Sequence, residues 1–231
     1  MHDPPGLSLL MPVYNEAPTV EAAIRGVLET KFPLPIELIV IDDGSTDGTS
    51  DLIARNSGSE EVRVVRHSQN GGKGAAVRTG LLHARGTYST IIDADLEYDP
   101  ADAARLLESL IDHSANAVYG VRGFESHSAY SFWYVVGNKG VTLATNVLYN
   151  SWISDLMTCH KMMRTDLFRA LPLRESGFAI ESEITALLLR RGVRVYEVPI
   201  TYNARTRDQG KKLRAIDGVR VLRTLLRCRL R

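Results

Sequence analysis

Short apolar runs alternate along the first half of the chain with segments whose apolar residues recur every three or four positions. The runs LSLLMPVY, IELIVI, EVRVVRH and TYSTII have the length and composition of buried strands. The first run is followed by Pro18, a residue type favoured in the first turn of a helix. Apolar residues then follow at helical spacing, at Val20, Ile24, Val27 and Leu28. The other runs are followed by similar helical segments, so the pattern predicts repeated strand–helix units.

Strands this apolar are covered on both faces, and their alternation with helices predicts a parallel or mixed sheet between two layers of helices. Ligands of such sheets bind at the carboxyl ends of the strands. Three unusual polar segments fall at these ends: DDGSTDGTS after the second run, NGGKG after the third and DADLEYDP after the fourth. With no repeat or low-complexity linker in the chain, the sequence predicts an α/β domain with its site at one edge of the sheet.

The segment DADLEYDP brings four carboxylates together directly after an apolar run. If the strand persists, Asp93 and Asp95 point the same way, roughly 6 to 7 Å apart. Oxygen ligands without His or Cys suit Mg²⁺ or Mn²⁺, which complete their shells with water and substrate phosphates, so a nucleoside diphosphate or triphosphate is implied. A solvated acidic turn is the alternative, and it suits Asp99, which precedes Pro100 as a helix cap would. An ion is favoured at Asp93 and Asp95 because charges this close repel one another.

Two glycine-containing segments have structural and functional interpretations. In DDGSTDG, the glycines, Ser45 and Thr46 are explained by a turn and a helix cap, but Asp42 and Asp43 are not. A carboxylate at this strand end could accept hydrogen bonds from a base N–H or from ribose hydroxyls. NGGKG lacks the GK[ST] ending of a P-loop, so it is weak evidence on its own.

Composition narrows the class of protein. The 231 residues are 44% hydrophobic and 24% charged, which suits one large globular domain, alone or with a small appendage. Cys159 and Cys228 lie far apart and outside any CxxC or Cys/His cluster, so neither a disulfide framework nor a zinc site is indicated. No run approaches the roughly 18 apolar residues that span a bilayer, and the start MHDPPG lacks the features of a signal peptide. We expect a cytoplasmic protein without a nucleic-acid partner.

The net charge of +1 hides a basic C-terminal segment. Residues 205–231 contain ten Lys or Arg and two Asp, which leaves a net charge of −7 for residues 1–204. If residues 214–231 form a helix, two neighbouring stripes result. The apolar stripe is Val219, Leu222, Leu226 and Leu230, and the basic stripe is Arg220, Arg223, Arg227 and Arg231. Such a helix can lie on an anionic membrane, or its leucine stripe can pack on the domain formed by residues 1–213.

Taken in order, the motifs resemble those of a known enzyme family. MPVYNE, IVIDDGSTDGT, NGGKGAAVRTG and DADLEYDP look like the nucleotide-sugar-binding segments of the family-2 inverting glycosyltransferases, which have the GT-A fold. The later segments AVYGVRGF, DLMTCHKMMR, GFAIESEI and EVPITYNARTRDQGKKLRAIDG are similar to the branch of dolichyl-phosphate mannose synthases and polyprenyl-phosphate glycosyltransferases. The resemblance covers about Leu7 to Arg229 and implies a GT-A catalytic domain with a mixed, mostly parallel sheet over residues 1–213.

Carried over position by position, the resemblance implies a nucleotide-sugar site and its metal. The nucleotide-binding residues would be Pro12, Tyr14, Glu16, Asp42, Asp43, Lys73, Asp93, Arg122 and Lys211. Asp43 would bind the base, with Asp42 beside it. Asp93 and Asp95 fall on the DxD motif that binds Mg²⁺ or Mn²⁺, with Asp95 as the main ligand. Glu97 is a third candidate metal ligand and stands where relatives often carry Gln or another polar residue.

The implied reaction is a single displacement at the anomeric carbon, in which the metal stabilises the diphosphate leaving group and no covalent enzyme intermediate forms. The candidate catalytic residues are Asp95, Glu181, Glu183 and Arg205. A hydroxyl acceptor would need Glu181 or Glu183 as general base, whereas a lipid phosphate is already an anion and needs cations to position it. The basic cluster favours the phosphate and comprises Arg205, Arg207, Lys211 and Lys212.

The primary hypothesis is transfer from GDP-mannose or a UDP-sugar to a polyprenyl or dolichyl phosphate, with possible contact at the cytoplasmic membrane face. The alternative within the same enzyme class is a soluble hydroxyl acceptor, either a small molecule or a glycan. A non-enzymatic nucleotide-binding module is disfavoured because it has little use for a complete DxD motif. A nucleotidyltransferase is disfavoured because it usually carries a different glycine-rich opening. The base stays open because Asp43 could face uracil or guanine.

Other residues have plainer interpretations. The histidines show no metal-binding spacing and are interpreted as surface or core residues: His67, His83, His113, His127 and His160. Cys159 is interpreted as a packing residue. Asp155 and Lys161 match family positions on the acceptor side, but a buried salt bridge would explain them equally well. Residues 131–152 predict a helix over the active site.

Overall fold

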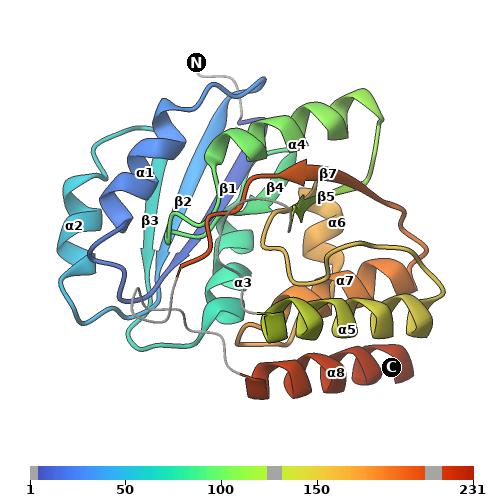
Figure 1. Ribbon diagram of the computed structural model, residues 1–231. Helices are drawn as coiled ribbons and strands as arrows, with labels where there is room; N and C mark the ends of the chain where they lie inside the picture. The colour runs from blue at the N-terminus through green and yellow to red at the C-terminus, as the bar shows by residue number, and fades with distance from the viewer. Residues whose placement is uncertain (1–4, 124–131, 206–214) are drawn as a thin grey trace.

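The computed structural model describes residues 5–123, 132–205 and 215–231 (Figure 1). Within these ranges, seven strands form one sheet in the order β3-β2-β1-β4-β6-β5-β7. The strands are β1 (Leu7–Val13), β2 (Ile36–Asp42), β3 (Val62–Arg66), β4 (Tyr88–Ile91), β5 (Ala117–Arg122), β6 (Lys161–Arg164) and β7 (Val195–Ile200). Strands β1 to β4 are parallel, β6 runs antiparallel between β4 and β5, and β7 is parallel to β5. The predicted α/β class and mixed, mostly parallel sheet are confirmed.

Helices cover both faces of the sheet, as the apolar strands predicted (Figure 1). The helices are α1 (Val20–Glu29), α2 (Thr49–Arg55), α3 (Lys73–His83), α4 (Pro100–Asp112), α5 (Phe132–Tyr149), α6 (Thr165–Ala170), α7 (Ile180–Arg190) and α8 (Ala215–Leu230). Leu9 and Met11 of β1 pack in the core under α1, α2 and α4, whereas Leu10 packs in the core under α3 and α5 to α8. Successive side chains of a strand point to opposite faces, so a doubly covered strand must be apolar throughout.

Helix α8 packs through a stripe that the sequence pattern did not single out. Val221, Leu225 and Cys228 are buried in the core shared with α5 and α7. The stripe of Val219, Leu222, Leu226 and Leu230 is exposed instead. The alternative in which these leucines pack on the domain is therefore wrong. In the described part of the chain, no helix combines the length and apolar character needed to cross a bilayer.

Two local interactions position β4, the strand that delivers the acidic segment. The Glu37 carboxylate of β2 accepts hydrogen bonds from Ser8 Oγ at 2.7 Å, from Arg85 Nε at 2.9 Å and from Gly86 N at 3.2 Å. A Cβ on Gly86 would lie 2.6 Å from Ser8 N, so only glycine fits this close approach to β1. Glu37 therefore ties the turn before β4 to strands β1 and β2. At the end of the acidic segment, Asp99 caps α4 by accepting from Ala101 N at 2.9 Å.

Replacing Glu37 by Gln should lower the free energy of unfolding by about 1.5 to 3 kcal/mol at pH 7, because hydrogen bonds to a charged acceptor are lost. Burial alone would raise the pKa of the Glu37 carboxyl, but hydrogen bonds from Ser8 and Arg85 outweigh it and hold the pKa below its ordinary value. The charge therefore stabilises the fold above the unfolded-state pKa, and this contribution is lost as the pH falls through the lower folded-state pKa.

Urea unfolding of the wild type and the Glu37→Gln variant at pH 7 and at about pH 3.5 measures this difference, which should be largest at pH 7. Glu61→Gln is the matched control, since Glu61 is exposed and its side chain accepts a local hydrogen bond from Ser59. Equal stabilities of wild type and Glu37→Gln at pH 7 would contradict the assigned role.

Candidate active site

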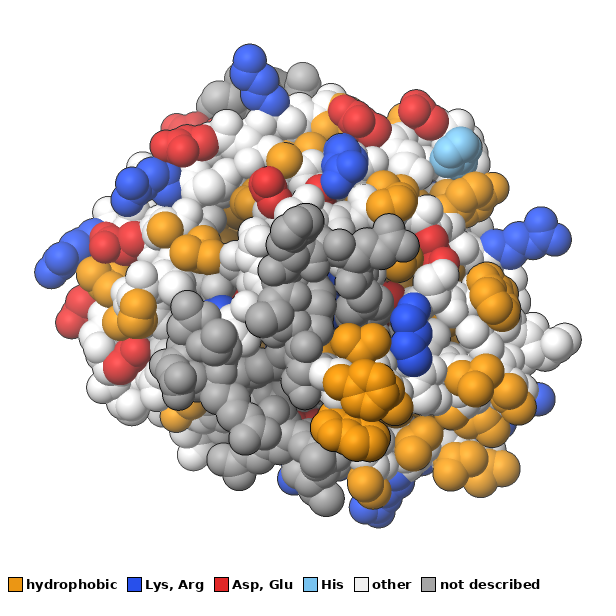
Figure 2. All heavy atoms as spheres, in the orientation of Figure 1, with side chains coloured by type: hydrophobic (Ala, Val, Ile, Leu, Met, Phe, Trp, Pro, Cys, Tyr) orange, Lys and Arg blue, Asp and Glu red, His pale blue; other side chains and the backbone are white. Residues whose placement is uncertain are grey.

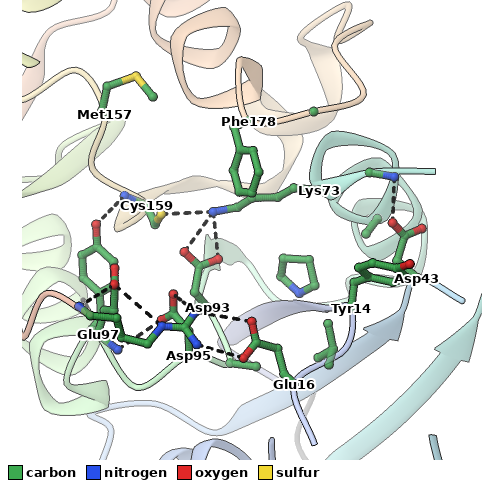
Figure 3. Close-up of a pocket in the computed structure, with 18 of the residues that line it drawn as sticks. Tyr14, Glu16, Asp43, Lys73, Asp93, Asp95, Glu97, Met157, Cys159 and Phe178 are labelled. Carbon is green, nitrogen blue, oxygen red and sulfur yellow. Dashed lines mark hydrogen bonds and ion pairs between the residues drawn. The ribbon is translucent and has the colours of Figure 1, made fainter. Parts of the chain in front are cut away.

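A cavity of about 350 Å³ opens at the carboxyl ends of β1, β2 and β4, where the sequence placed the site. Residues from chain segments distant in sequence line it, and Figure 3 shows their side chains pointing toward one another. Asp43 lies at one end of the cavity and Glu97 at the other, with Asp93 between them (Figure 3). The sequence-predicted residues that line it are Pro12, Tyr14, Glu16, Asp43, Lys73, Asp93, Asp95, Glu97, Arg122 and Arg205.

Arg205 is the centre of the acidic end of the cavity. Its guanidinium lies 3.1 Å from Glu16 Oε2, 3.0 Å from Asp95 Oδ2 and 3.8 Å from Glu97 Oε1. The backbone N–H of Arg205 also donates to Glu97 Oε1 at 2.8 Å, and Tyr202 donates to Glu97 Oε2 at 2.5 Å. One cation thus contacts three carboxylates from two segments, the end of β1 and the acidic segment after β4. A cation among acidic groups that are brought together away from water favours their ionised forms.

The charge compensation around Asp95 is incomplete. Burial, together with neighbouring Asp93 and Glu97, raises the pKa of the Asp95 carboxyl to about 7, although Arg205 acts in the opposite direction. A bound cation would favour the ionised carboxylate at this position.

The residues present fit a divalent ion that takes few ligands from the protein. In residues 5–123, 132–205 and 215–231, no three His, Cys, Asp or Glu side chains form a ready-made metal cluster. Mg²⁺ is usually held by one or two carboxylates and completes its shell with water and substrate phosphates. Asp95 provides such a carboxylate, and its Oδ2 contacts Arg205, as Glu97 does, while Asp93 contacts Lys73.

Lys73, the first residue of α3, connects the cavity to the buried side of the site. Its Nζ lies 2.8 Å from Asp93 Oδ1, 3.1 Å from Glu181 Oε1 and 3.0 Å from Cys159 Sγ. Burial alone would lower the pKa of the Lys73 ammonium, but Asp93, Cys159 and Glu181 raise it well above its usual value. Lys73 therefore stays charged and fixes the Asp93 carboxylate.

The two candidate general bases, Glu181 and Glu183, lie outside the cavity lining. Glu181 is buried behind Lys73, and its other oxygen lies 3.7 Å from Lys161 Nζ. Glu183 accepts from the backbone N–H groups of residues 174 and 175 at 2.8 and 2.7 Å and lies near Arg227 of α8 and Arg231 just after it. In this arrangement Glu181 contacts two buried lysines and Glu183 anchors a loop, and neither lines the cavity.

Asp42 also lies outside the cavity lining, although Asp43 lines it. Asp42 accepts from Ser45 N at 2.9 Å and from Ser50 Oγ at 2.5 Å, and Arg66 Nε lies 3.4 Å away. These contacts close the turn after β2. The two adjacent aspartates therefore have different roles: Asp42 stabilises this turn and Asp43 lines the cavity. The predicted residues Arg207, Lys211 and Lys212 lie outside the described ranges.

Arg122 forms a buried bidentate pair with Asp155, with Nε and Nη2 at 2.7 and 2.8 Å from the two carboxylate oxygens. The guanidinium also lies 4.9 Å from the ring centre of Tyr202. The salt-bridge interpretation of Asp155 is thus confirmed, and that of Lys161 is confirmed by its contact with Glu181. Arg122 still lines the cavity, with its charge balanced by Asp155.

Several residues at the site were missed or interpreted differently from the sequence. Cys159 is a cavity residue as well as a packing residue, Tyr202 holds Glu97, and His67 contacts Asp43 at 2.6 Å. Tyr202 lies within EVPITYNAR, a segment that the resemblance covered, but nothing in its spacing indicates the contact. The remaining newly found lining residues include Tyr98, Tyr134, Met157 and Phe178.

Comparisons with known proteins agree with the fold. The family model described as glycosyl transferase family 2 matches residues 8–171. The chain is 31% identical over 207 residues to glycosyltransferase AglJ of Haloferax volcanii, covering 89% of this chain and 65% of that protein. It is 26% identical to the dolichyl-phosphate beta-glucosyltransferase of Saccharomyces cerevisiae, covering 97% and 74% of the two chains. It is 27% identical to the dolichol-phosphate mannosyltransferase of Pyrococcus furiosus, covering 89% and 58%.

The chain therefore spans just under two thirds of the length of AglJ and less of the archaeal mannosyltransferase. Among solved structures, glucosyl-3-phosphoglycerate synthase from Mycobacterium tuberculosis in complex with UDP has a TM-score of 0.76 at 22% identity, covering 97% of this chain and 80% of that one. The same enzyme in complex with Mg²⁺ and UDP has a TM-score of 0.75 at 21% identity, with 97% and 79% covered. These likenesses show the GT-A fold. Together with the family match over residues 8–171 and the dolichyl-phosphate sugar transferases among the relatives, they establish that the chain belongs to glycosyl transferase family 2.

Proposed function

We propose that the protein is a metal-dependent inverting glycosyltransferase that transfers a sugar from a nucleoside-diphosphate sugar to a polyprenyl phosphate. The observation that carries the proposal is the acidic end of the cavity, where Glu16, Asp95 and Glu97 surround a single arginine beside a strand-end pocket containing Asp43. Such an arrangement suits a nucleoside at one end and a metal-bound diphosphate at the other.

In the proposed reaction, an acceptor oxygen forms a bond to the anomeric carbon while the bond to the diphosphate oxygen breaks. A divalent ion held at Asp95 would supply charge stabilisation for the departing diphosphate. Lys73 holds Asp93 in place from the buried side, and Arg122 keeps a fixed positive charge at the cavity wall. Attack opposite the leaving group inverts the anomeric configuration without a covalent enzyme intermediate.

The positions of the carboxylates favour a phosphate acceptor over a hydroxyl. A hydroxyl must lose its proton to a base, yet Glu181 and Glu183 lie outside the cavity lining and are held by other contacts. A phosphate oxygen carries negative charge already and needs no base. Two guanidinium groups line the cavity, Arg205 among three carboxylates and Arg122 paired with Asp155. Two relatives, a dolichyl-phosphate and a dolichol-phosphate sugar transferase, support the same choice.

A membrane-facing role for α8 completes the proposal. The exposed stripe of Val219, Leu222, Leu226 and Leu230 is available because other residues of α8 pack on the domain. Helix α5 packs beside α8, with Tyr149 donating to the carbonyl of Leu225 at 2.8 Å, and it exposes Trp133. Figure 2 shows hydrophobic side chains gathered at the lower right, in the region where Figure 1 places α5 and α8.

Exposed arginines flank these apolar side chains, so we infer that the occupant of this surface is an anionic lipid bilayer. Arg220 and Arg223 of α8 are exposed beside the leucine stripe. Each basic residue near an anionic surface contributes on the order of 1 kcal/mol to binding, and apolar side chains add to it by insertion. Such contact would bring the cavity to a lipid-borne phosphate.

Asp95→Asn tests the metal. The variant should fold, bind Mn²⁺ at least about tenfold more weakly and lose most of its sugar transfer, because one charged ligand of a poorly compensated site is removed. Electron paramagnetic resonance of Mn²⁺ gives the affinity independently of activity. Asp99→Asn is the control, because Asp99 belongs to the same acidic segment but caps α4, a position where Asn serves equally well. Full transfer by the wild type in excess EDTA would contradict the metal dependence.

The acceptor is tested with a matched pair of lipids. Incubation with labelled UDP- and GDP-sugars and Mn²⁺ should yield labelled lipid from polyprenyl phosphate and none from polyprenol, which carries a hydroxyl instead. Arg205→Ala should lower transfer to the phosphate by about tenfold or more, since a charged hydrogen-bond partner is lost. Efficient glycosylation of polyprenol or of a soluble hydroxyl compound would establish the alternative acceptor class.

The membrane surface is tested by co-sedimentation with vesicles containing phosphatidylserine. Binding should weaken with salt and fall by about tenfold or more in Leu226→Gln/Leu230→Gln and in Arg220→Gln/Arg223→Gln, because insertion and charge attraction are removed separately. Leu82→Gln is the control, since Leu82 is an exposed leucine on α3. Wild-type protein that stays in the supernatant at low salt would overturn the membrane contact.

A further inference from the structure

Asp43, at the nucleoside end of the cavity, is surrounded by hydrogen-bond donors of the protein itself. Its side chain is only 3% exposed, yet it lines the cavity. Oδ1 accepts from His67 Nδ1 at 2.6 Å and from Gly71 N at 2.9 Å, and Oδ2 accepts from Gly72 N at 2.7 Å. Three of the roughly four hydrogen bonds that a carboxylate can accept are therefore already formed.

Two of these three donors, His67 and Gly72, are fixed by their own surroundings. The second ring nitrogen of His67 lies 2.9 Å from Thr79 Oγ1 of α3, which sets the plane of the imidazole. Because a carboxylate only accepts, Nδ1 carries the proton in this pair. Gly72 has a φ of +88°, and a Cβ there would lie 2.4 Å from the carbonyl oxygen of Ser176, so the loop can hold this shape only with glycine.

The remaining acceptor capacity of Asp43 is one site on Oδ2. Guanine presents two neighbouring donors, N1–H and the 2-amino group, which need two acceptors side by side to be satisfied together. Uracil presents a single donor, N3–H, and needs one. A buried guanine donor left without an acceptor would lose affinity, because it gives up its hydrogen bond to water.

We propose that His67 is a specificity-determining residue, which occupies Oδ1 of Asp43 and thereby selects a uracil nucleotide over a guanine nucleotide. The inference deepens the proposed function, since it names the donor class of that same site as a UDP-sugar. His67 acts through Asp43 and is a positioning residue that does not touch the reacting atoms. Its removal would expose a second acceptor on Oδ1 and so allow guanine to bind in a bidentate manner.

Calorimetry with UDP, GDP, CDP and ADP in the presence of Mn²⁺ measures the selection directly. The wild type should bind UDP at least about tenfold more tightly than GDP, the factor expected for one unsatisfied donor. His67→Ala should reduce the ratio of the two Kd values by about tenfold, mainly through tighter GDP binding. A merely structural role for His67 would weaken both nucleotides together and leave the ratio unchanged.

His67→Asn is the conservative variant, because the asparagine amide can donate from near the position of Nδ1 and should retain the preference for UDP. Thr79→Val releases the imidazole without removing it and should shift the ratio in the same direction as His67→Ala, which keeps the test available if His67→Ala fails to fold. His113→Ala, an exposed histidine at the end of α4, should change neither Kd.

The outcomes separate this inference from the proposed function. GDP or CDP binding as tightly as UDP would overturn the selection for uracil and leave the nucleotide-sugar function intact. An unchanged ratio in folded His67→Ala and Thr79→Val would overturn the role of His67. If none of the four nucleotides binds with Mn²⁺, the proposed function itself fails.

Discussion

Compensation of buried negative charge at the carboxyl edge of the sheet is the constraint on which the site depends. Glu16, Asp93, Asp95 and Glu97 come from the ends of β1 and β4 and meet in a space largely shielded from water. Like charges at such distances cannot all stay ionised without cations between them. Arg205 and Lys73 provide these cations from opposite sides, and the raised pKa of Asp95 marks where the compensation falls short.

The two cations also connect parts of the fold that are far apart in sequence. Lys73 links the start of α3 to β4 through Asp93 and to α7 through Glu181, which in turn contacts Lys161 of β6. Arg205 follows β7 and returns that end of the chain to the first and fourth strands. Loss of either cation would leave a buried carboxylate unpaired, which is among the costlier changes in a protein interior. The same ion pairs therefore compensate the charge of the site and hold together the distant segments that form its walls.

The sequence by itself determined the class of the fold, the edge at which the site lies and the charged side chains that line the cavity. Apolar strands covered on both faces have a distinctive pattern, and polar segments such as DADLE at strand ends are conspicuous because buried strands do not otherwise lead into clustered charges. Asp95, Asp43 and Lys73 were identified in this way and by resemblance, and all three line the cavity. The roles assigned to them stay predictions.

Only the tertiary structure decided which polar groups face the cavity and which serve other groups of the protein. Adjacent residues Asp42 and Asp43 are indistinguishable by composition, yet one closes a turn and the other lines the site, because successive side chains at a strand end point to opposite sides. Glu181 and Glu183 resemble bases in sequence but are held by contacts that form only when α7 packs on distant segments. Likewise, one apolar stripe of α8 is buried against α5 and α7 and the other is exposed. The sequence pattern could not distinguish the two stripes, because contacts between distant segments leave no periodic signal in it.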